Sequence, residues 1–269
     1  MKLKHLINTT LAGLLACALW SCDTVKEDDR LIPVKKPDVN RNVLIEDFTG
    51  QNCIKCPAAA EEIEKLQERY GDAIIAVAIH SGPFGHRTTM SSPRLPLCTE
   101  TGDEYYTHWD IKEQPTALVN RRASLTSPDL YADAVAKELE KTTPLEMTLT
   151  AGYDADTRHV DIAINATTSE AVSGKLQVWV IENNIVAQQK MGDGSTNSDY
   201  IHQHVFRTSV TSDIYGDEFS VTDTAPTAAS YQVTLDEAWK AEHVAIVAIA
   251  SNAADGVLQV VKTELTINE

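Results

Sequence analysis

The pattern of apolar and polar positions after residue 41 predicts a β-α-β unit. Val43 to Phe48 is a short apolar run that predicts a buried strand. The following stretch has apolar residues at helical spacing, namely Ala59, Ile63, Leu66 and Tyr70. We expect this helix to begin near Cys53, which places Pro57 in its first turn, and to end at Gly71. The run from Ala73 to Ile79 alternates too weakly for a half-exposed strand and therefore predicts a parallel strand buried on both faces.

A β-β-α unit is predicted after an irregular stretch from Ser81 to Lys112, which is expected to contain a helix at Thr101 to Trp109. The sequence from Gln114 to Asn120 predicts a strand entered through a proline, and a short antiparallel strand is expected to follow it. Ser127-Pro128 is typical of a helix start, with a capping serine before a proline at the first helical position. This helix is expected to run to about residue 141.

The remainder of the chain, from Pro144, predicts an all-β domain of seven or eight short strands. Polar and apolar residues alternate clearly from Val160 to Ile164 and from Leu176 to Val180, and turn residues separate the runs. The expected strands are Leu145 to Ala151, Val160 to Thr167, Leu176 to Ile185, Ile201 to Arg207, Glu218 to Val221, Tyr231 to Leu235, Val244 to Ser251 and Val257 to Ile267. This number of short strands favours an immunoglobulin-like sandwich.

The first of the two predicted domains resembles the thioredoxin fold over residues 42 to 142. The order is β-α-β, an excursion and then β-β-α, with Cys53-Ile54-Lys55-Cys56 at the start of the first helix and Pro115-Thr116 at the start of the third strand. The fold class expected for the whole chain is therefore an α/β thioredoxin-like domain followed by an all-β immunoglobulin-like sandwich.

A redox role for Cys53 and Cys56 follows from their position. The positive end of a helix dipole and the charge of Lys55 both favour a thiolate, so Cys53 is expected to attack and Cys56 to resolve. The resemblance implies that Pro115 is a cis-proline facing the pair. Asp47 stands six residues before Cys53, where thioredoxins keep a buried acid that assists proton transfer, although the neighbouring Glu46 leaves this role open.

Other interpretations of the cysteine motif remain open. Asn52 stands where thioredoxins usually have an aromatic residue, so a permanent Cys53–Cys56 disulfide is an alternative to a redox-active one. No second close pair of Cys or His completes a zinc site, and neither a metal nor a cofactor is expected. Cys98 is either a spare thiol or a third redox partner. His202 and His204 are expected on one face of a strand, where they anchor the loop 192–200 as a hydrogen-bonded pair or bind a metal with a nearby aspartate.

The N-terminus predicts export and a lipid anchor. Lys2 and Lys4 precede an apolar stretch too short to span a bilayer, which is typical of a signal peptide over residues 1–21. Leu19-Trp20-Ser21-Cys22 resembles a bacterial lipobox in which Cys22 is lipidated, although the segment ending at Cys17 is a rival. Residues 22–41 are charged and contain prolines, as expected for a tether, and the two domains are expected at 42–143 and 144–269. A formal charge of -16 disfavours nucleic acid as a partner.

Several segments together resemble the outer-membrane-protein-28-related lipoproteins of the Bacteroidetes group. They are the lipobox, VLIEDFTGQNCIKCP, QPTALVNRR, VWVIENNIVAQQ and YIHQHVFR. The resemblance implies an outer-membrane location, a thioredoxin-like domain and a following Ig-like one, without a specific reaction. From the residues we expect thiol–disulfide exchange with protein or peptide thiols of the envelope. The alternative is a non-enzymatic binding lipoprotein in which Cys53–Cys56 is structural.

Overall fold

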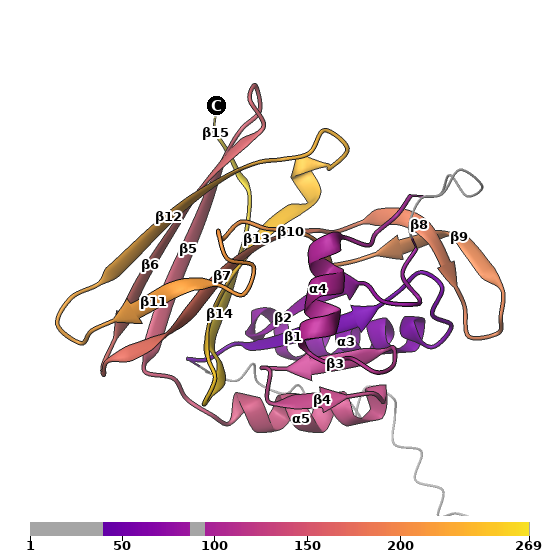
Figure 1. The fold of residues 1–269 in the computed structure, drawn as a ribbon, viewed down its shortest axis with the longest axis horizontal. Helices are drawn as coiled ribbons and strands as arrows, with labels where there is room; N and C mark the ends of the chain where they lie inside the picture. Colours follow the sequence, from indigo (N-terminus) through magenta and orange to yellow (C-terminus); the bar gives the residue numbers. More distant parts are fainter. Residues whose placement is uncertain (1–39, 87–94, 269) are drawn as a thin grey trace, which may run out of the picture. The chain divides into compact units, whose positions relative to one another are not determined.

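The computed structural model describes residues 40–86 and 95–268 of the 269-residue chain. Cys17, Cys22, the signal peptide and most of the tether lie outside these residues. Residues 36–269 belong to one compact unit. The structure is mostly β-sheet with few helices (Figure 1).

The strands before residue 144 form a four-stranded section of a larger sheet. The elements of this part are β1 (Val43–Thr49), α3 (Cys56–Tyr70), a 3-10 turn (Gly71–Ala73), β2 (Ile74–His80), α4 (Glu100–His108), β3 (Thr116–Val119), β4 (Ala123–Leu125), a 3-10 turn (Pro128–Leu130) and α5 (Tyr131–Leu139). β1 runs parallel to β2 and antiparallel to β3, and β4 follows β3. Both faces of β1 and β2 are buried, as expected for their continuous apolar runs.

The part of the chain after residue 144 is built of β-strands. They are β5 (Leu145–Asp154), β6 (His159–Thr168), β7 (Val172–Glu182), β8 (Ile185–Lys190), β9 (Thr196–His202), β10 (Val205–Ser209), β11 (Asp217–Val221), β12 (Thr227–Thr234), β13 (Val244–Asn252), β14 (Gly256–Glu264) and β15 (Thr266–Asn268). β12, β6, β5 and β15 form a four-stranded sheet, while β8 and β9 form a separate hairpin. An apolar core lies between the four-stranded sheet and the faces of β7 and β13 that carry Val178 and Ile246.

One sheet crosses the expected domain boundary near residue 143. Its strand order is β14-β13-β7-β10-β2-β1-β3-β4, and β11 also pairs with β7. The junction is the parallel pair β10–β2, where Val205 lies opposite Ala78. The sequence could not predict this pairing, because β10 is short and more than 100 residues away from β2.

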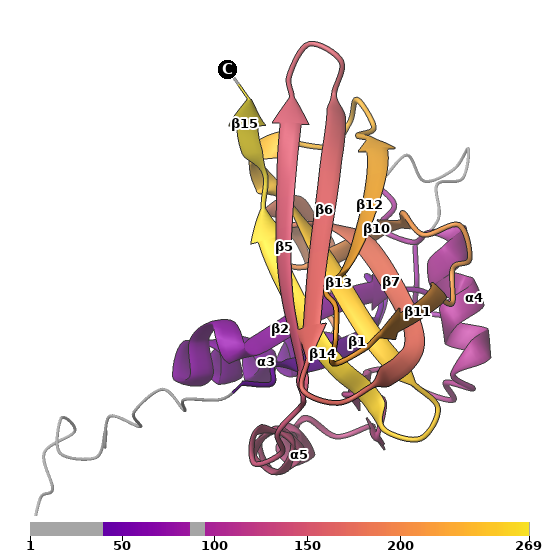
Figure 2. The same ribbon diagram turned by 90° about the vertical axis from the view of Figure 1, so that its left-hand side faces the viewer.

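The helices cover the two faces of this sheet differently. Side chains of α3 and α5 pack with Val43 and Ile45 of β1 in one core. Tyr105 of α4 packs in another core with Leu44, Phe48 and Trp179. Because neighbouring residues of a strand point to opposite faces, α3 and α4 lie on opposite sides of the sheet (Figure 2). None of the helices among the described residues is long and apolar enough to cross a membrane.

Several sequence predictions need correction. The described residues after 144 form eleven strands and not seven or eight, and the strand expected from Val257 to Ile267 is divided at Leu265 into β14 and β15. The helix after the cysteine motif begins at Cys56, not near Cys53, because Cys53 N–H donates to Gly50 O at 3.0 Å and forms a turn first. The strand expected from Leu176 to Ile185 ends at Glu182, and a new strand begins at Ile185.

The strand expected from Ile201 to Arg207 is also divided, because His204 has a positive φ of 55° between β9 and β10. His202 and His204 therefore do not share a face of one strand.

Candidate functional site

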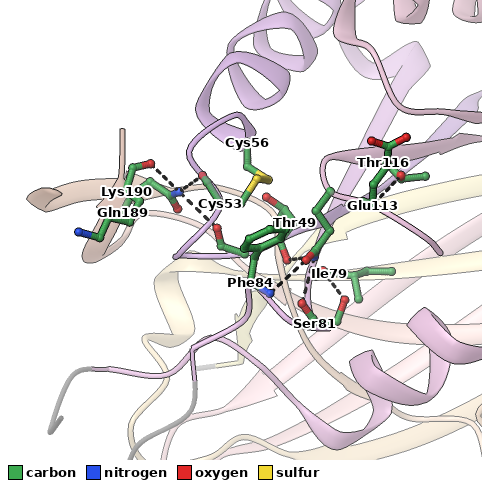
Figure 3. The surroundings of a disulfide bond; sticks show 12 residues. Thr49, Cys53, Cys56, Ile79, Ser81, Phe84, Glu113, Thr116, Gln189 and Lys190 are labelled. Carbon is green, nitrogen blue, oxygen red and sulfur yellow. Dashed lines mark hydrogen bonds between the residues drawn. A yellow bond between two sulfur atoms is a disulfide. The ribbon is translucent and has the colours of Figure 1, made fainter. Parts of the chain in front are cut away.

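The Cys53–Cys56 disulfide lies between the end of β1 and the first turn of α3 (Figure 3). Pro57 occupies the first turn of α3, as expected, and Lys55 precedes the helix without a side-chain cap. Both cysteines are buried, each with an exposed fraction of 2%. The turn that leads into α3 places the two sulfur atoms within bonding distance. The resulting disulfide is buried.

Pro115 lies close in the sheet to the residues that lead into the disulfide. Register places Phe48 of β1 opposite Thr116 of β3, so Pro115 lies beside the end of β1. The Gln114–Pro115 peptide bond is cis, and Pro115 is buried. Gln114 Nε2 donates to Thr49 O at 2.6 Å and to Ser81 O at 3.0 Å. The Gln114 side chain therefore joins the ends of β1 and β2. A direct role for Pro115 in thiol–disulfide exchange remains a prediction.

The two neighbouring acids, Glu46 and Asp47, point to opposite faces of β1. Glu46 receives three hydrogen bonds from the Arg121 guanidinium, at 2.8 to 3.1 Å, in a buried ion pair. Asp47 has no such cation, and its Oδ1 has no hydrogen-bond partner among the described residues. Burial raises the pKa of Asp47 from 3.8 to about 7. The two acids therefore differ in their surroundings, since Glu46 is paired with Arg121 and Asp47 is buried without a cation among the described residues. A role for Asp47 in proton transfer remains a prediction.

A pocket of about 480 Å³ lies between α3, the end of β9 and the sheet. Asp47, Cys56, His80 and His202 line it and are all buried, whereas Cys53 does not contribute to its lining. Exposed side chains also line the pocket, among them Glu61, Glu64 and Ile201. The pocket therefore connects the surface with Cys56 and the buried acid.

Three histidines of the pocket have pKa values below the ordinary 6.5. Burial lowers the pKa of His202 and of His204 to about 4, and it lowers that of His80 well below its usual value. The rings of His80 and His202 lie 5.1 Å apart, and His204 Nε2 lies 2.9 Å from Gln67 Oε1. The expected pair of His202 and His204 is thus replaced by separate contacts. In the part of the chain that the structure describes, no group of three or more His, Cys, Asp or Glu side chains is placed to hold a metal ion.

The β8–β9 hairpin contacts the backbone of the turn that contains Cys53. Gln189 Nε2 donates to Cys53 O at 2.9 Å and to Gly50 O at 3.3 Å, and Lys190 N–H donates to Gln51 O at 2.8 Å. Figure 3 shows Gln189 reaching the Cys53 backbone from the hairpin, with Phe84 beside the same turn. Local sequence patterns could not predict this contact, because Gln189 and Cys53 are 136 residues apart.

Cys98 lies near the loop that follows β2. Its Sγ would be 2.2 Å from a Cβ placed on Gly85, so the absence of a side chain at Gly85 makes room for this sulfur. Cys98 is partly buried and is not one of the two cysteines of the Cys53–Cys56 disulfide. Whether it takes part in exchange remains a prediction.

The family profile described as "Outer membrane protein Omp28" matches residues 102–269, which is more than half of the chain. The chain belongs to the Omp28 family. This is a family of outer membrane proteins, and the matched region begins after the cysteine motif. The cysteine site must therefore be judged from its own residues.

Solved structures similar to this Omp28-family chain come from several bacteria. HBP35 of Porphyromonas gingivalis is 18% identical with a TM-score of 0.66, covering 86% of this chain and 77% of that one. Protein AGR_C_4864 from Agrobacterium tumefaciens is 18% identical with a TM-score of 0.48, covering 85% and 95% respectively. A domain of the outer membrane lipoprotein Omp28 from Porphyromonas gingivalis is 18% identical with a TM-score of 0.35, covering 48% and 93%. No curated protein matches. The likeness to HBP35 shows a shared fold and nothing about activity.

Proposed function

We propose that this Omp28-family protein carries out thiol–disulfide exchange in the cell envelope, with Cys53 and Cys56 cycling between disulfide and dithiol. The observation that carries the proposal is the shared pocket of Cys56 and Asp47. An acid with a pKa of about 7 is matched to proton transfer at neutral pH, and disulfide reduction requires protons for the released sulfurs. The exchange needs no cofactor beyond the cysteine pair.

The proposal includes a thioredoxin-like organisation of residues 42–143. The sheet order β2-β1-β3-β4 supports it, as do α3 and α5 packing in one core on the same face. An immunoglobulin-like sandwich over residues 144–269 is supported by the two sheets that face each other across a common core. In this arrangement the two domains share a continuous sheet.

The proposal also includes a lipid on Cys22 that holds the protein at the outer membrane. The family name and the lipobox-like sequence around Cys22 support this part. Radiolabelled palmitate should be incorporated into the wild-type chain expressed in a lipoprotein-processing bacterium. Incorporation that persists in Cys22→Ser and disappears in Cys17→Ser would place the lipid on the other cysteine.

A second candidate function is non-enzymatic binding, with Cys53–Cys56 as a structural bridge. The burial of both cysteines and the hydrogen bonds of Gln189 to the turn favour it. In that case the disulfide would resist thiols until the protein unfolds.

The exchange assay uses the oxidised full-length chain in detergent, mixed without oxygen with excess free cysteine. We expect about one molecule of cystine per chain to form in native buffer, and none above background with the Cys53→Ala variant. Cystine formation only after guanidinium is added would contradict the proposal and favour the structural bridge.

A further inference from the structure

We infer that the substrate is a small thiol of amino-acid to short-peptide size, which enters the pocket beside α3 and reacts at Cys56 and not at Cys53. This inference rests on the proposed exchange function and names its substrate class and route. It follows from three features: the position of Cys56 in the pocket, the covered side of Cys53, and the polar atoms left without partners.

The pocket has the size and depth for a small molecule. Its volume of about 480 Å³ lies within the range of about 300–1,000 Å³ that is usual for small-ligand sites. Glu61 and Ile201 are exposed at its rim, whereas Cys56 and Asp47 are buried in it. A molecule in this pocket meets Cys56, because Cys53 is not part of the lining.

The backbone around Cys53 is covered by two other segments of the chain. Asn52 N–H donates to Phe84 O at 2.9 Å, and the Cβ of an alanine at position 50 would lie 2.4 Å from the Phe84 backbone. On the hairpin side, Gln189 binds the Cys53 carbonyl. A folded protein substrate would have to displace both segments to reach Cys53, whereas a small thiol in the pocket displaces neither.

Three buried polar atoms in side chains of pocket-lining residues have no hydrogen-bond partner among the described residues. They are Asp47 Oδ1, His80 Nδ1 and His202 Nε2. Leaving a buried polar atom without a partner is destabilising. A ligand with amino or carboxyl groups supplies the missing partners when these side chains turn toward it, whereas an apolar thiol supplies none. Polar small thiols are therefore favoured over apolar ones.

The exchange at Cys56 needs no reagent other than two substrate thiols and the protein disulfide. The thiolate of the first substrate molecule attacks Cys56 Sγ, the Cys53–Cys56 bond breaks, and Cys53 leaves as a thiolate. A second substrate thiolate then attacks the substrate sulfur of the mixed disulfide and releases Cys56 as a thiolate. Two substrate thiols are oxidised to one disulfide, the protein disulfide is reduced, and the two substrate protons end on Cys53 and Cys56.

The route is tested with two tryptophan variants in the first turns of the same helix, α3. Ala60 lines the pocket, whereas Ala58 is exposed and outside it. In the cystine-formation assay with full-length protein, Ala60→Trp should slow exchange at least tenfold, and Ala58→Trp should leave the rate within twofold of wild type. Equal rates for the two variants, with an active wild type, would overturn the route and leave the exchange function standing. A wild type without exchange would instead overturn the function.

The site of reaction is tested with single-cysteine variants and iodoacetamide, each alkylated cysteine being identified by peptide mass. Cys56 in the Cys53→Ser variant should react at least ten times faster than Cys53 in the Cys56→Ser variant. Faster reaction of Cys53 would overturn the assignment to Cys56. The tryptophan variants keep the disulfide, so the route can be tested even if a serine variant fails to fold.

Discussion

Replacing Asp47 by asparagine should stabilise the protein at alkaline pH and remove part of its pH dependence. Burial raises the pKa of Asp47 from 3.8 to about 7. Between these values the native state keeps a proton that the unfolded chain has released, so the free energy of unfolding falls as the pH rises. Above about pH 7 the native carboxylate is charged and buried, and the whole penalty is present.

The size of this penalty follows from the two pKa values. At about 1.4 kcal/mol for each tenfold change, the difference between 3.8 and about 7 corresponds to about 4 kcal/mol. Asparagine has nearly the same shape and no charge. Between pH 4 and pH 8, the free energy of unfolding of the wild type should therefore fall by about 4 kcal/mol more than that of Asp47→Asn.

The measurement is guanidinium unfolding of the oxidised chain from Asp23 at a series of pH values between 4 and 8. Lowered pKa values of His202 and His204 act with the opposite sign, because the unfolded histidines bind protons below pH 6.5 that the native ones do not. Both proteins contain these histidines, so their contributions cancel when the free energy of unfolding of the wild type is subtracted from that of the variant. Asp129→Asn, at an exposed position, is the control and should give a flat difference. A flat difference for Asp47→Asn as well would refute the reasoning.

Three further substitutions test the surroundings of the disulfide. Arg121→Ala should lower the free energy of unfolding by about 3–5 kcal/mol, because it leaves Glu46 buried and charged without its cation; a loss below 1 kcal/mol in a denaturant titration would contradict this. Gln189→Ala should lower stability by about 1–3 kcal/mol and speed reduction of the disulfide by cysteine. Gln188→Ala removes a buried nitrogen that has no partner among the described residues, so it should neither lower stability nor speed reduction. Gly50→Ala should cost about 1–3 kcal/mol in the same titration, because its Cβ would lie 2.4 Å from the Phe84 backbone; an unchanged midpoint would contradict that contact.

Local sequence patterns predicted those parts of the fold that depend on local structure. The spacing of Ala59, Ile63 and Leu66 predicted the buried face of α3, and all three are buried in one core. The run from Ala73 to Ile79 predicted a strand buried on both faces, which is β2. A helix was also expected at the position of α4.

Contacts between distant segments could not be predicted in this way. The β8–β9 hairpin is polar and half-exposed, so its sequence resembles a loop, and its contact with Cys53 depends on the fold of both halves of the chain. The pairing of β10 with β2 has the same origin. The different surroundings of the two acids also depend on a distant contact, because Arg121, which lies in the left-handed region at φ 57°, binds Glu46 and not Asp47.

The reduction potential of Cys53–Cys56 is the most direct test of whether this pair is redox-active. The chain from Asp23 is equilibrated in thiol buffers of graded potential, and the alkylated cysteines are counted by mass, with Cys98 counted separately by its peptide. We predict a reversible two-electron couple above about -300 mV, because labile and catalytic disulfides lie in that range. A pair that stays oxidised well below about -300 mV would contradict the redox role and identify Cys53–Cys56 as a structural bridge.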